Sequence, residues 1–518
     1  MDDARSGAME RSHFVKIIVI GAGMGGMMSA ARLAKAGHQV SLYEASDRVG
    51  GKLRTEWIGK VAFDTGPSLL TLPAVYKDFF ARTGKQLGLL CEIKAVDPSF
   101  DYHFADGTSV KFANLSRYHT LNNLRAVYGE PVARQWDQLM RRAEKMWDVS
   151  REPFIENELR SPLSLLKRFS LIRDLKIIAP WKTLRDFATE ELSDGHLRYI
   201  LDRYATYSGS DPRKAPAVLS TIAYVEESFG AWHIKGGLGT LATLVHERAE
   251  KVGVIFHLNS PVASIDVKKG KARGITLDSG EVIESDAVIA NADASLIYNT
   301  LIKAKIRKIK KVRKNIAKAD PSLAGFSLLL GMRKDGSMPL NHHTVLFPKD
   351  YDAEFDAIFT HKQPVTEPTI YICAPDDETM SKDELLEGWF VLVNAPAHGA
   401  EGFDWNDAEF ARNYANTIID HIEARGIPVR SRLESMTIRT PADLENAVRA
   451  PGGSIYGTSS NGARAAFMRA KNRSPIKNLY CVGGSAHPGG GLPLVGLSAE
   501  MVANAIGSAQ SGQPLRSH

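Results

Sequence analysis

Short apolar runs alternate with helical patterns along the first part of the chain. Residues 14–20 (FVKIIVI) form a β-branched run that is typical of a strand buried in a parallel sheet. A glycine-rich loop follows, and residues 27–37 (MMSAARLAKAG) then predict a helix that ends at Gly37. Residues 38–44 (HQVSLYE) predict the next strand. This order of elements predicts a β-α-β unit and an α/β fold.

The rest of the chain divides by pattern into further segments. Residues 115–225 are helical in character, whereas residues 254–292 contain several short strand-like runs separated by turn sequences such as KKGK and DSGE. Residues 322–395 are again mixed and strand-like. A last strand at 478–482 enters a second glycine-rich loop, and a helix over 495–506 follows. No internal repeat is visible, and the length of 518 residues suggests two to four domains or subdomains.

Composition and charge exclude some classes of protein but do not identify a function. The 518 residues are 44% hydrophobic and 24% charged, which is typical of a globular protein with a sizeable core. Lys and Arg number 65 against 59 Asp and Glu, a net charge of +6. This excess is small for the length, so we expect no nucleic-acid partner.

The cysteines and the apolar segments bear on location. Cys91, Cys373 and Cys481 are far apart without metal-type spacing, so neither a disulfide framework nor a metal site is predicted. The first residues, MDDARSGAMERSH, lack the apolar centre of a secretory signal. The longest uncharged stretch, 478–499, is rich in glycine and interrupted by proline, so no transmembrane helix is expected. These features predict a cytoplasmic location.

The first glycine-rich loop carries the clearest chemistry. Gly21, Gly23 and Gly26 fit the pattern GxGxxG between a predicted strand and a predicted helix, where backbone N–H groups and the helix dipole can hold a pyrophosphate. Glu44 ends the second strand, where a carboxylate can accept both ribose hydroxyls. The alternative is a glycine turn that serves packing only. The pattern does not separate FAD from NAD, although the acid argues against a 2′-phosphate.

Three further stretches carry a family resemblance. Residues 47–55 (DRVGGKLRT) resemble the RxGG element of the amine-oxidase-like FAD superfamily, and residues 63–71 (FDTGPSLLT) resemble its segment beneath the isoalloxazine ring. Residues 479–493 (LYCVGGSAHPGGGLP) resemble the C-terminal flavin motif of bacterial carotenoid desaturases, the phytoene-desaturase family. Interior stretches at 203–207, 235–239, 290–293, 342–347 and 368–374 agree, so the resemblance spans about residues 14–508. RYATYSG, YICA and FVLVNAP most resemble the acyclic 1-hydroxycarotenoid 3,4-desaturase branch.

The resemblance implies a fold and its organisation. It implies a Rossmann-like FAD-binding domain of the amine-oxidase and glutathione-reductase-like type, an inserted mixed α+β substrate domain, and a helical membrane-facing part. The FAD-binding domain is expected in three parts, 14–114, 226–300 and 471–508. Residues 115–225 are expected to form the helical substrate- and membrane-facing region, and residues 301–470 the substrate domain. Residues 1–13 are expected to be disordered and 509–518 to form a loose tail.

The resemblance also implies the residues that hold FAD. The N-terminal group is Gly21, Gly23, Gly26, Glu44, Arg48, Gly50, Gly51, Lys52, Arg54, Gly66, Pro67 and Ser68, and the remaining group is Val262, Gly483, Gly484, Ser485, Gly490 and Val495. Many superfamily members have an acid after the C-terminal strand glycine, but Gly484 and Ser485 stand here, so backbone N–H groups or the Ser485 hydroxyl would contact the ribityl chain. The helix near Leu494 would direct its N-terminus at the flavin, or would simply close the sheet.

Two histidine motifs and one glycine turn have competing interpretations. His487 is expected near the isoalloxazine, either as a proton acceptor or as a hydrogen-bonded residue that shapes the loop. His342 and His343 adjoin a strand-like run, so their side chains are expected on opposite faces, which disfavours joint metal binding. The sequence KGGLG at 235–239 favours a turn and helix start over direct flavin contact.

The implied reaction is desaturation of an acyclic carotenoid. A hydride would pass from an allylic carbon to flavin N5 and a proton would leave the adjacent carbon, with no nucleophile or metal required. Oxygen and a membrane quinone are both suitable electron acceptors. The alternatives are a redox-neutral carotene isomerase, a polyene-saturating reductase, and a flavin oxidase of another lipophilic or a polar substrate. A non-catalytic flavin-binding partner of a pigment-synthesis complex has no sequence feature in its favour.

A hydrocarbon substrate implies contact with a bilayer. Stretches 159–187 and 302–318 each combine apolar residues with many lysines and arginines. Such stretches either lie on anionic headgroups or pack their apolar side on the protein core. The expectation is peripheral, monotopic association with the cytoplasmic membrane.

Overall fold

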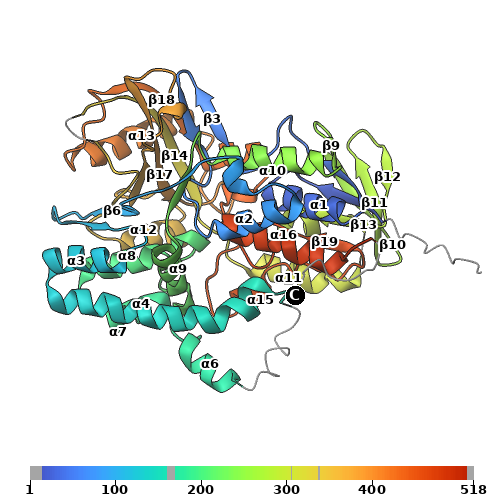
Figure 1. Ribbon diagram of the computed structural model, residues 1–518, viewed down its shortest axis with the longest axis horizontal. Helices are drawn as coiled ribbons and strands as arrows, with labels where there is room; N and C mark the ends of the chain where they lie inside the picture. The colour runs from blue at the N-terminus through green and yellow to red at the C-terminus, as the bar shows by residue number, and fades with distance from the viewer. Residues whose placement is uncertain (1–14, 160–169, 305, 337–338, 510–518) are drawn as a thin grey trace, which may run out of the picture.

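The computed structural model describes residues 15–159, 170–304, 306–336 and 339–509 (Figure 1). The segments expected to be disordered at 1–13 and loose at 509–518 lie outside the described residues, except Ala509. Its N–H donates to the carbonyl of Ala36 at 3.2 Å. Two large sheets organise the molecule, a five-stranded one and a seven-stranded one.

The five-stranded sheet is entirely parallel. Its order is β19-β13-β1-β2-β9, formed by β1 (Lys16–Ile20), β2 (Gln39–Tyr43), β9 (Ile255–His257), β13 (Ala287–Ala290) and β19 (Leu479–Cys481). The sequence pattern predicted all five strands, and the β-α-β unit at the N-terminus is confirmed. Because the strands are parallel, their carboxyl ends share one edge of the sheet, which is where ligands bind in such folds.

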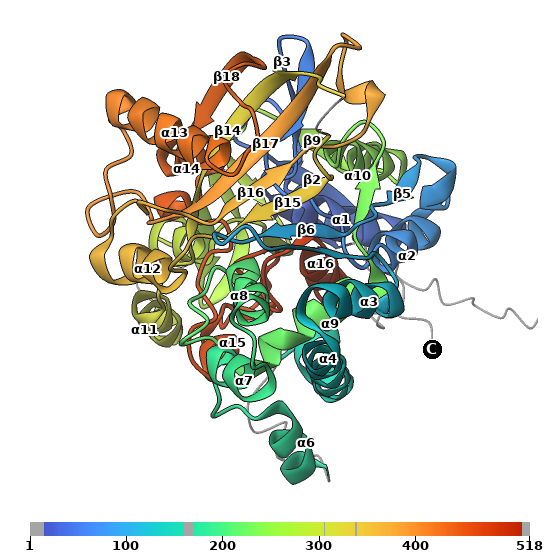
Figure 2. The ribbon, with the colours of Figure 1, turned by 90° about the vertical axis from the view of Figure 1, so that its left-hand side faces the viewer.

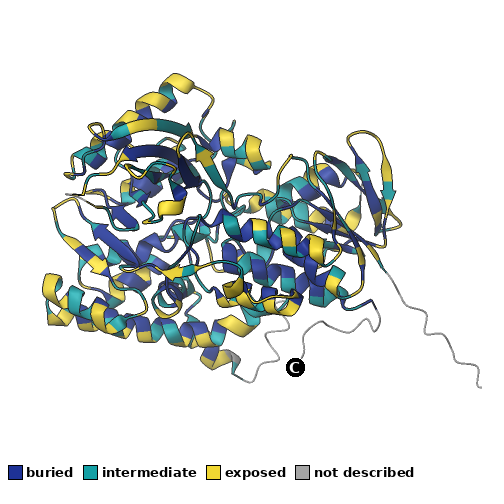
Figure 3. Ribbon diagram, turned by 45° about the horizontal axis from the view of Figure 1, so that its top comes forward, coloured by how far each residue is buried: buried dark blue, intermediate teal, exposed yellow. Residues whose placement is uncertain are grey.

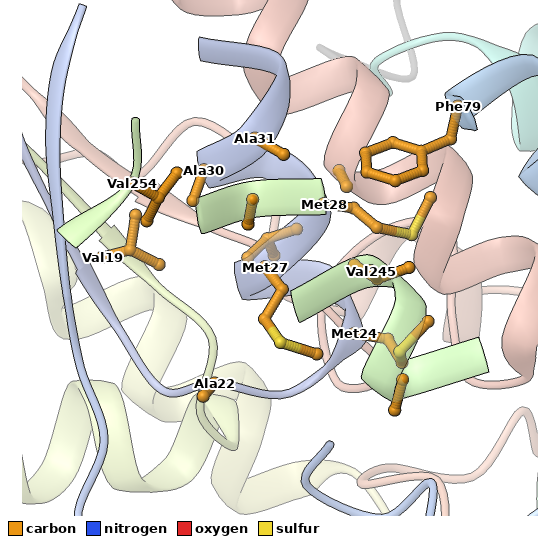
Figure 4. Close-up of a cluster of buried hydrophobic side chains, with 14 of the residues drawn as sticks. Val19, Ala22, Met24, Met27, Met28, Ala30, Ala31, Phe79, Val245 and Val254 are labelled. Atoms are coloured by element: carbon orange, nitrogen blue, oxygen red, sulfur yellow. The ribbon is translucent and has the colours of Figure 1, made fainter. Parts of the chain in front are cut away.

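Helices cover the five-stranded sheet. α1 (Met24–Lys35) packs between α10 (Gly239–Lys251) and α16 (Leu492–Ile506), with α2 (Ala74–Thr83) beside it. Figure 4 shows Met24, Met27 and Met28 of α1 inserted among apolar side chains of the neighbouring helices. α1 begins three residues before the predicted start, so Gly25 and Gly26 lie in its first turn. Small residues there let the helix approach the sheet closely.

The opposite face of this sheet packs against a smaller antiparallel sheet. That sheet contains β10 (Val262–Lys268), β11 (Lys271–Leu277) and β12 (Val282–Glu284), as the turn pattern predicted. The stretch at 302–318 lies beside it as η6 (Arg307–Ile309) and α11 (Lys310–Lys318). Ile302 and Ile309 are fully buried, and the remaining apolar residues pack against the same cluster. The core-packing alternative therefore holds for the described residues of 302–318, and their lysines are exposed to solvent.

The seven-stranded sheet is mostly antiparallel. Its order is β18-β14-β17-β16-β15-β6-β7, with β6 (Phe100–His103), β7 (Ser109–Phe112), β14 (Ala324–Arg333), β15 (His343–Leu346), β16 (Ile370–Cys373), β17 (Leu386–Ala395) and β18 (Leu433–Arg439). α13 (Ala408–Glu423) and α14 (Pro441–Val448) cover one side (Figure 2). β6 and β7 belong to this sheet, so the expected boundary at 114 does not coincide with a sheet boundary. β6 joins through a parallel pairing with β15, a long-range contact without a local pattern.

The regular elements described within 115–225 are helices, as the pattern predicted. They are α3 (Arg117–Tyr128), α4 (Glu130–Ser150), η2 (Arg151–Glu156), α6 (Leu171–Ile178), α7 (Leu184–Glu191), α8 (Gly195–Arg203), η3 (Thr206–Ser208), η4 (Ala217–Ser220) and α9 (Thr221–Phe229). α4 buries Trp136, Leu139, Met140 and Ala143 at helical spacing. These helices face β6 and β15 across one aromatic-rich core, while α6 projects from the body (Figures 1 and 2).

The remaining elements are short. They are the hairpin β3 (Thr55–Ile58) and β4 (Val61–Asp64), the pair β5 (Ile93–Ala95) and β8 (Trp232–Ile234), α12 (Asp352–Phe355), α15 (Ala465–Met468), η1 (Leu87–Leu89), η5 (Leu296–Leu301), η7 (Asp356–His361), η8 (Glu378–Met380) and η9 (Pro451–Gly453). Buried residues follow the two sheets and the inner sides of their helices (Figure 3). Within the described ranges, no helix combines the length and the apolar character needed to cross a bilayer.

Candidate active site

The GxGxxG loop lies at the carboxyl edge of the parallel sheet. The N–H of Gly21 donates to the carbonyl of Tyr43 at 2.8 Å, and the N–H of Ala22 donates to Glu44 Oε2 at 2.8 Å. Ser46 donates to Glu44 Oε1 through its N–H and its hydroxyl, both at 2.9 Å. Oε2 thus accepts one hydrogen bond and Oε1 two, and because a carboxylate oxygen can accept two or more, Glu44 keeps capacity for ribose hydroxyls. Its place beside the loop is the predicted one.

Asn291 explains why the loop requires glycine. A Cβ on Gly21 would lie 2.4 Å from the carbonyl oxygen of Asn291, and the φ of Gly21 is +92°. A Cβ on Gly23 would lie 2.6 Å from Asn291 Oδ1, and one on Gly26 would lie 2.1 Å from the Gly21 carbonyl oxygen. Side chains are therefore excluded from all three positions, which leaves room for a phosphate to approach the backbone of the loop.

Two helices begin at this edge without side-chain caps. α1 starts after Gly23 and α16 after Gly491, and neither has an acidic residue in its first turn. The first N–H groups of a helix have no partner within the helix, so both N-termini offer donors and a positive dipole to an anionic or electron-rich group. Val495 donates its N–H to Gly491 as α16 begins and packs on the core below it.

The RxGG element folds directly over the first loop. Gly50 forms a bridge with Gly23, and its N–H donates to Ala22 at 2.9 Å. A Cβ on Gly51 would lie 3.1 Å from Gly23 Cα. The predicted glycines are thus brought together with the nucleotide loop.

The basic residues of this element differ in their surroundings. Arg48 is exposed, whereas Arg54 is partly buried and its Nε has no partner among the described residues. Lys52 Nζ donates to the carbonyls of Ser454 and Ile455, both at 2.7 Å. Burial lowers the pKa of Lys52 to about 8, and the charge of Asp293 acts in the opposite direction. Arg54 therefore has an unused donor in the site, while Lys52 fixes the 454–455 backbone.

The segment 66–68 runs from the hairpin toward the seven-stranded sheet. A Cβ on Gly66 would lie 1.7 Å from the Lys52 carbonyl oxygen, so only glycine permits this approach. Pro67 follows, and Ser68 is buried with its hydroxyl 2.8 Å from the Tyr371 hydroxyl. The segment thus connects the nucleotide loops to a residue of β16.

The C-terminal glycine loop meets the N-terminal one. A Cβ on Gly25 would lie 3.2 Å from Gly483, and Asn291 Nδ2 donates to the Val482 carbonyl at 3.1 Å. Gly490 lies against Tyr456, where a Cβ would come within 2.5 Å of the ring. The predicted flavin segments therefore converge although they are far apart in sequence.

Ser485 is already engaged by the chain. Its hydroxyl accepts from the N–H of Ala294 at 2.8 Å and lies 3.4 Å from the Ala292 carbonyl. These bonds tie the C-terminal loop to the residues that follow β13. The backbone of this loop is therefore the better candidate for a ribityl contact.

Sequence reasoning did not select Asn291 or Arg469 as site residues. Arg469 is 8% exposed and donates to the carbonyls of Thr458 at 2.9 Å and Gly484 at 2.8 Å. Burial lowers its pKa to about 10 against the opposing charge of Asp293. Asn291 directly follows a strand of the parallel sheet, and that position was the available signal. Arg469 precedes no regular element that would have indicated its role.

His487 is buried and holds the loop through several bonds. Its Nε2 lies 2.9 Å from the Asn157 carbonyl, and its own carbonyl accepts from Asn472 at 2.9 Å and from Ser498 at 2.8 Å. A carbonyl only accepts, so Nε2 carries a proton. Burial lowers the pKa of His487. This geometry favours the loop-shaping alternative over a proton acceptor at Nε2.

Val262 opens β10 and is buried in the cluster behind the parallel sheet. That cluster also contains Tyr43, from the strand that ends at Glu44. Val262 therefore lies near the strand that ends at Glu44, and its contact with the adenine of the cofactor stays a prediction.

The glycine turn at 235–239 starts a helix. The N–H of Leu238 donates to both oxygens of Asp64, at 2.9 and 3.0 Å, and the N–H of Gly239 donates to Thr55 Oγ1 at 2.8 Å. The first N–H groups of α10 are thus satisfied by the β3–β4 hairpin. The turn and helix-start interpretation is confirmed.

His233 and Asp377 link this turn to the loop after β16. Asp377 accepts from His233 Nε2 at 2.9 Å, from the Gly236 N–H at 2.7 Å and from the Thr379 hydroxyl at 2.6 Å. Burial opposes ionisation, but these bonds hold the pKa of Asp377 at about 2, below its usual 3.8.

This pair predicts a loss of stability in acid. Because the pKa of Asp377 is lower in the folded than in the unfolded state, its ionised carboxylate stabilises the fold above about pH 4. This contribution of about 2 kcal/mol is lost as the pH falls toward 2. Asp377→Asn is expected to lower stability at neutral pH and to flatten this part of the acid-unfolding profile. Circular dichroism against pH measures both effects. The exposed neighbour variant Asp376→Asn is the control, and equal profiles for the two variants would contradict the prediction.

The two adjacent histidines differ from expectation. Their ring centroids are 4.5 Å apart, because His342 precedes β15 and is not in regular strand geometry. With Cys373 they form a group whose ligand atoms lie within 4.8 Å of one another. The expected opposite orientation is wrong. Two features nevertheless disfavour a metal ion at this group. Burial raises the pKa of the Cys373 thiol well above its usual range, and His343 Nδ1 already lies 2.8 Å from the Tyr371 hydroxyl.

The residues present fit a dinucleotide of the FAD type. Four features lie at one edge of the parallel sheet. They are loop glycines without room for side chains, two uncapped helix N-termini, the Glu44 carboxylate and the Arg54 Nε, which has no partner among the described residues. These groups suit a ribose, a pyrophosphate and an electron-rich ring. The arrangement supplies binding and orientation of a redox cofactor.

Comparisons with known proteins agree with this geometry. Residues 24–326 match the family described as flavin containing amine oxidoreductase. The 1-hydroxycarotenoid 3,4-desaturase of Flavobacterium sp. (strain P99-3) is 31% identical over 499 residues, which cover 95% of this chain and 99% of that protein. The 4,4′-diaponeurosporene oxygenase of Staphylococcus haemolyticus (strain JCSC1435) is 29% identical over 498 residues, covering 95% and 97%.

Solved structures share the fold. An oxidoreductase from Methanosarcina mazei superposes with a TM-score of 0.62 at 16% identity, over 94% of this chain and 99% of that one. A putrescine oxidase bound to putrescine superposes with a TM-score of 0.63 at 15% identity, over 94% and 98%. At these identities the likeness supports the fold alone.

Proposed function

The chain belongs to the flavin containing amine oxidoreductase family and is an FAD-dependent oxidoreductase, and from this premise we propose that it desaturates acyclic carotenoids. The observation that carries the proposal is the full-length similarity to the 1-hydroxycarotenoid 3,4-desaturase. We further propose that the five-stranded sheet and its helices form the Rossmann-like FAD-binding domain and that the seven-stranded sheet belongs to the substrate domain.

The residues of the site perform binding and orientation. Bound FAD supplies the acceptor for a hydride from an allylic carbon. Gly23 and the α1 N-terminus provide N–H donors for the pyrophosphate, and Glu44 accepts from the ribose. The uncapped N-terminus of α16 provides a positive dipole, which favours an electron-rich ring beside it.

The surroundings of these loops suit an apolar substrate. The core between the helices and β6, β15 and β16 is aromatic, and includes Phe100, Tyr102, Tyr204 and Tyr371. Aromatic walls orient a polyene and exclude water from the position where the hydride leaves. His487 acts as a positioning residue for the C-terminal loop, since its Nε2 is committed to Asn157.

The reaction class is tested by the flavin itself. FAD-loaded protein mixed without oxygen with liposomes that carry a 1-hydroxylated carotenoid or phytoene is expected to lose its visible flavin absorbance while a red-shifted carotenoid forms. An unbleached flavin beside an isomerised carotenoid would instead establish the redox-neutral isomerase. Reoxidation by oxygen or by a quinone then identifies the electron acceptor, for which we propose either compound.

We propose peripheral association with the cytoplasmic membrane through α6. Ile172 is 75% exposed and Trp181 just after the helix is 65% exposed, and the basic residues Arg173 and Lys176 are exposed beside them. α6 projects from the body, where it can reach a surface (Figure 2). Exposed apolar and cationic side chains together match the headgroup region of an anionic bilayer. The neighbouring residues 160–169 of the predicted stretch lie outside the described residues.

The double variant Ile172→Ser/Trp181→Ser is expected to bind vesicles containing an anionic phospholipid at least about 10-fold more weakly, because two apolar side chains no longer enter the interface. Co-sedimentation with such vesicles at low and high salt measures the loss. Leu385→Ser is the matched control, since Leu385 is 71% exposed but far from α6 in sequence. Equal binding of the double variant and the control would contradict contact through α6.

A further inference from the structure

A buried arginine lies in the aromatic core beside the predicted flavin segments. Arg203, the last residue of α8, is 8% exposed, and its guanidinium carbon lies 4.7 Å from the ring centroid of Phe100, 5.1 Å from that of Tyr207 and 5.8 Å from that of Tyr371. Its Nη1 donates to the Tyr207 hydroxyl at 3.0 Å. It forms no ion pair with a described residue. A buried guanidinium has five donors, so this arrangement leaves donors for another group.

A buried carboxylate balances the charge of Arg203, and tyrosine hydroxyls link the two groups. Glu226 of α9 is 4% exposed and accepts from the hydroxyls of Tyr204 at 2.6 Å and Tyr207 at 3.0 Å. Arg203 and Glu226 thus share Tyr207 and carry opposite charges inside one network. A second buried anion would have no compensating charge, which is costly in an apolar interior. The network therefore favours a neutral ligand.

Polar atoms around Arg203 lack partners within the described part of the chain. The hydroxyl of Tyr351 and Nε2 of His343 are buried and form no hydrogen bond. The His343 ring stacks on Phe100, the ring that Arg203 contacts, at a centroid distance of 5.1 Å, and Tyr351 belongs to the same aromatic cluster. Buried polar atoms are normally satisfied by protein, water or a ligand. A hydrocarbon chain alone would leave them unsatisfied.

The network connects with both predicted flavin segments. Tyr371 lies 2.8 Å from the Ser68 hydroxyl, at the end of the 66–68 segment. Tyr456 packs against Gly490 of the C-terminal loop and is within electrostatic range of Arg203. A group bound at Arg203 therefore lies beside the loops that would hold the cofactor.

We propose that Arg203, Tyr207 and Tyr371 form a subsite that hydrogen-bonds a neutral oxygen function, a hydroxyl or a carbonyl, carried by the carotenoid. This inference rests on the proposed desaturase function and specifies its substrate class as oxygenated acyclic carotenoids. The guanidinium and the Tyr371 hydroxyl donate to the oxygen, whereas the Tyr207 hydroxyl, which donates to Glu226, accepts from Arg203 and holds the guanidinium in place. The surrounding rings hold the adjoining polyene. A site built to bond an oxygen disfavours the analogue that lacks it, because its donors then stay unpaired.

Paired substrates test the subsite. For the wild type, kcat/KM is expected to be about 10-fold to 100-fold higher for a 1-hydroxylated acyclic carotenoid than for the hydrocarbon of the same chain length and unsaturation. Tyr371→Phe and Tyr207→Phe are each expected to reduce this ratio about 10-fold, and Arg203→Met to remove the preference. A carotenoid aldehyde of the same length shows whether a carbonyl is accepted as well.

The controls separate a subsite from a structural role. Tyr414 is also buried, and its hydroxyl donates to the Val365 carbonyl at 2.9 Å on the other side of the seven-stranded sheet. Tyr414→Phe is expected to change stability without changing the substrate ratio. FAD content and circular dichroism verify that each variant is folded, and the two Tyr→Phe variants test the subsite if Arg203→Met does not fold.

The outcomes are distinct for the two proposals. If both carotenoids reduce the flavin and the ratio is the same in wild type, Tyr371→Phe and Tyr207→Phe, the subsite is refuted while the desaturase function stands. If neither carotenoid reduces the flavin of the folded wild type, the desaturase function is refuted together with the subsite that rests on it.

Discussion

Replacing Gly21 with valine is expected to abolish FAD loading. The φ of Gly21 is +92°, a region that β-branched residues do not tolerate, and a Cβ there would lie 2.4 Å from the Asn291 carbonyl oxygen. The loop cannot move away from Asn291, because the Asn291 N–H donates to Ile20 at 2.8 Å. The flavin-to-protein ratio after purification, from visible absorbance, is expected to fall to near zero.

Backbone strain and close approach are separable by a matched variant. Gly280 has a similar φ of +88°, but no atom lies within 4 Å of a Cβ at that position. Gly280→Val is therefore expected to retain flavin. Glu44→Gln introduces no strain and is expected to weaken FAD affinity about 10-fold through loss of a charged acceptor. A Gly21→Val protein that purifies yellow with full flavin content would refute the assignment of this loop to the cofactor.

The second large effect is expected at Arg469. Its guanidinium donates to the carbonyls of Tyr456, Thr458 and Gly484, and so fixes both the 456–458 segment and the C-terminal glycine loop. Arg469→Met leaves these carbonyls without their donors in a buried region and is expected to cost about 3 kcal/mol or more. The loop that carries Gly484 would loosen, so flavin is expected to dissociate at a lower temperature.

Arg473 provides the comparison, because it is the same residue type a few positions along the chain. Its side chain is 46% exposed, and it pairs with Glu158 at 3.1 Å and donates to the Ala505 carbonyl at 2.9 Å. Arg473→Met is expected to cost at most about 1 kcal/mol, since water screens an exposed pair. Flavin fluorescence during a thermal ramp reports the release temperature of each variant. Equal release temperatures would show that Arg469 does not hold the loop.

Local patterns were sufficient for much of the fold. The strands at 16–20, 39–43 and 271–277 coincide with predicted runs because burial in a sheet imposes an apolar composition on few consecutive residues. Predicted helix starts were less accurate: α1 begins before its predicted start, because its first turn consists partly of loop glycines. The hairpin at 55–64 was not predicted, because its strands are short and only its two ends fall within the stretches assigned to the cofactor, 47–55 and 63–71.

Amphipathic character alone did not indicate what covers an apolar side. The stretches 159–187 and 302–318 have similar compositions, yet Ile309 is fully buried on the protein and Ile172 is 75% exposed. The difference depends on whether a neighbouring element covers the helix, and that neighbour is distant in sequence. The adjacent rings of His342 and His343 also depend on a neighbouring element, because the position where β15 begins is set by its pairing with β16.

The sequence by itself determined the β-α-β unit, the two glycine-rich loops, Glu44 at a strand end, and the family resemblance that implies FAD. These features follow from the order and spacing of residues within short segments, so they are legible without a structure. Only the tertiary structure placed Gly25 against Gly483, Asn291 beneath the first loop, Arg469 behind the second, and Arg203 among the tyrosines next to Ser68. Apart from Arg469 and Gly484, which are 15 residues apart, these contacts join segments far apart in the sequence. Their geometry is set by the pairing of strands and the packing of helices rather than by any local pattern.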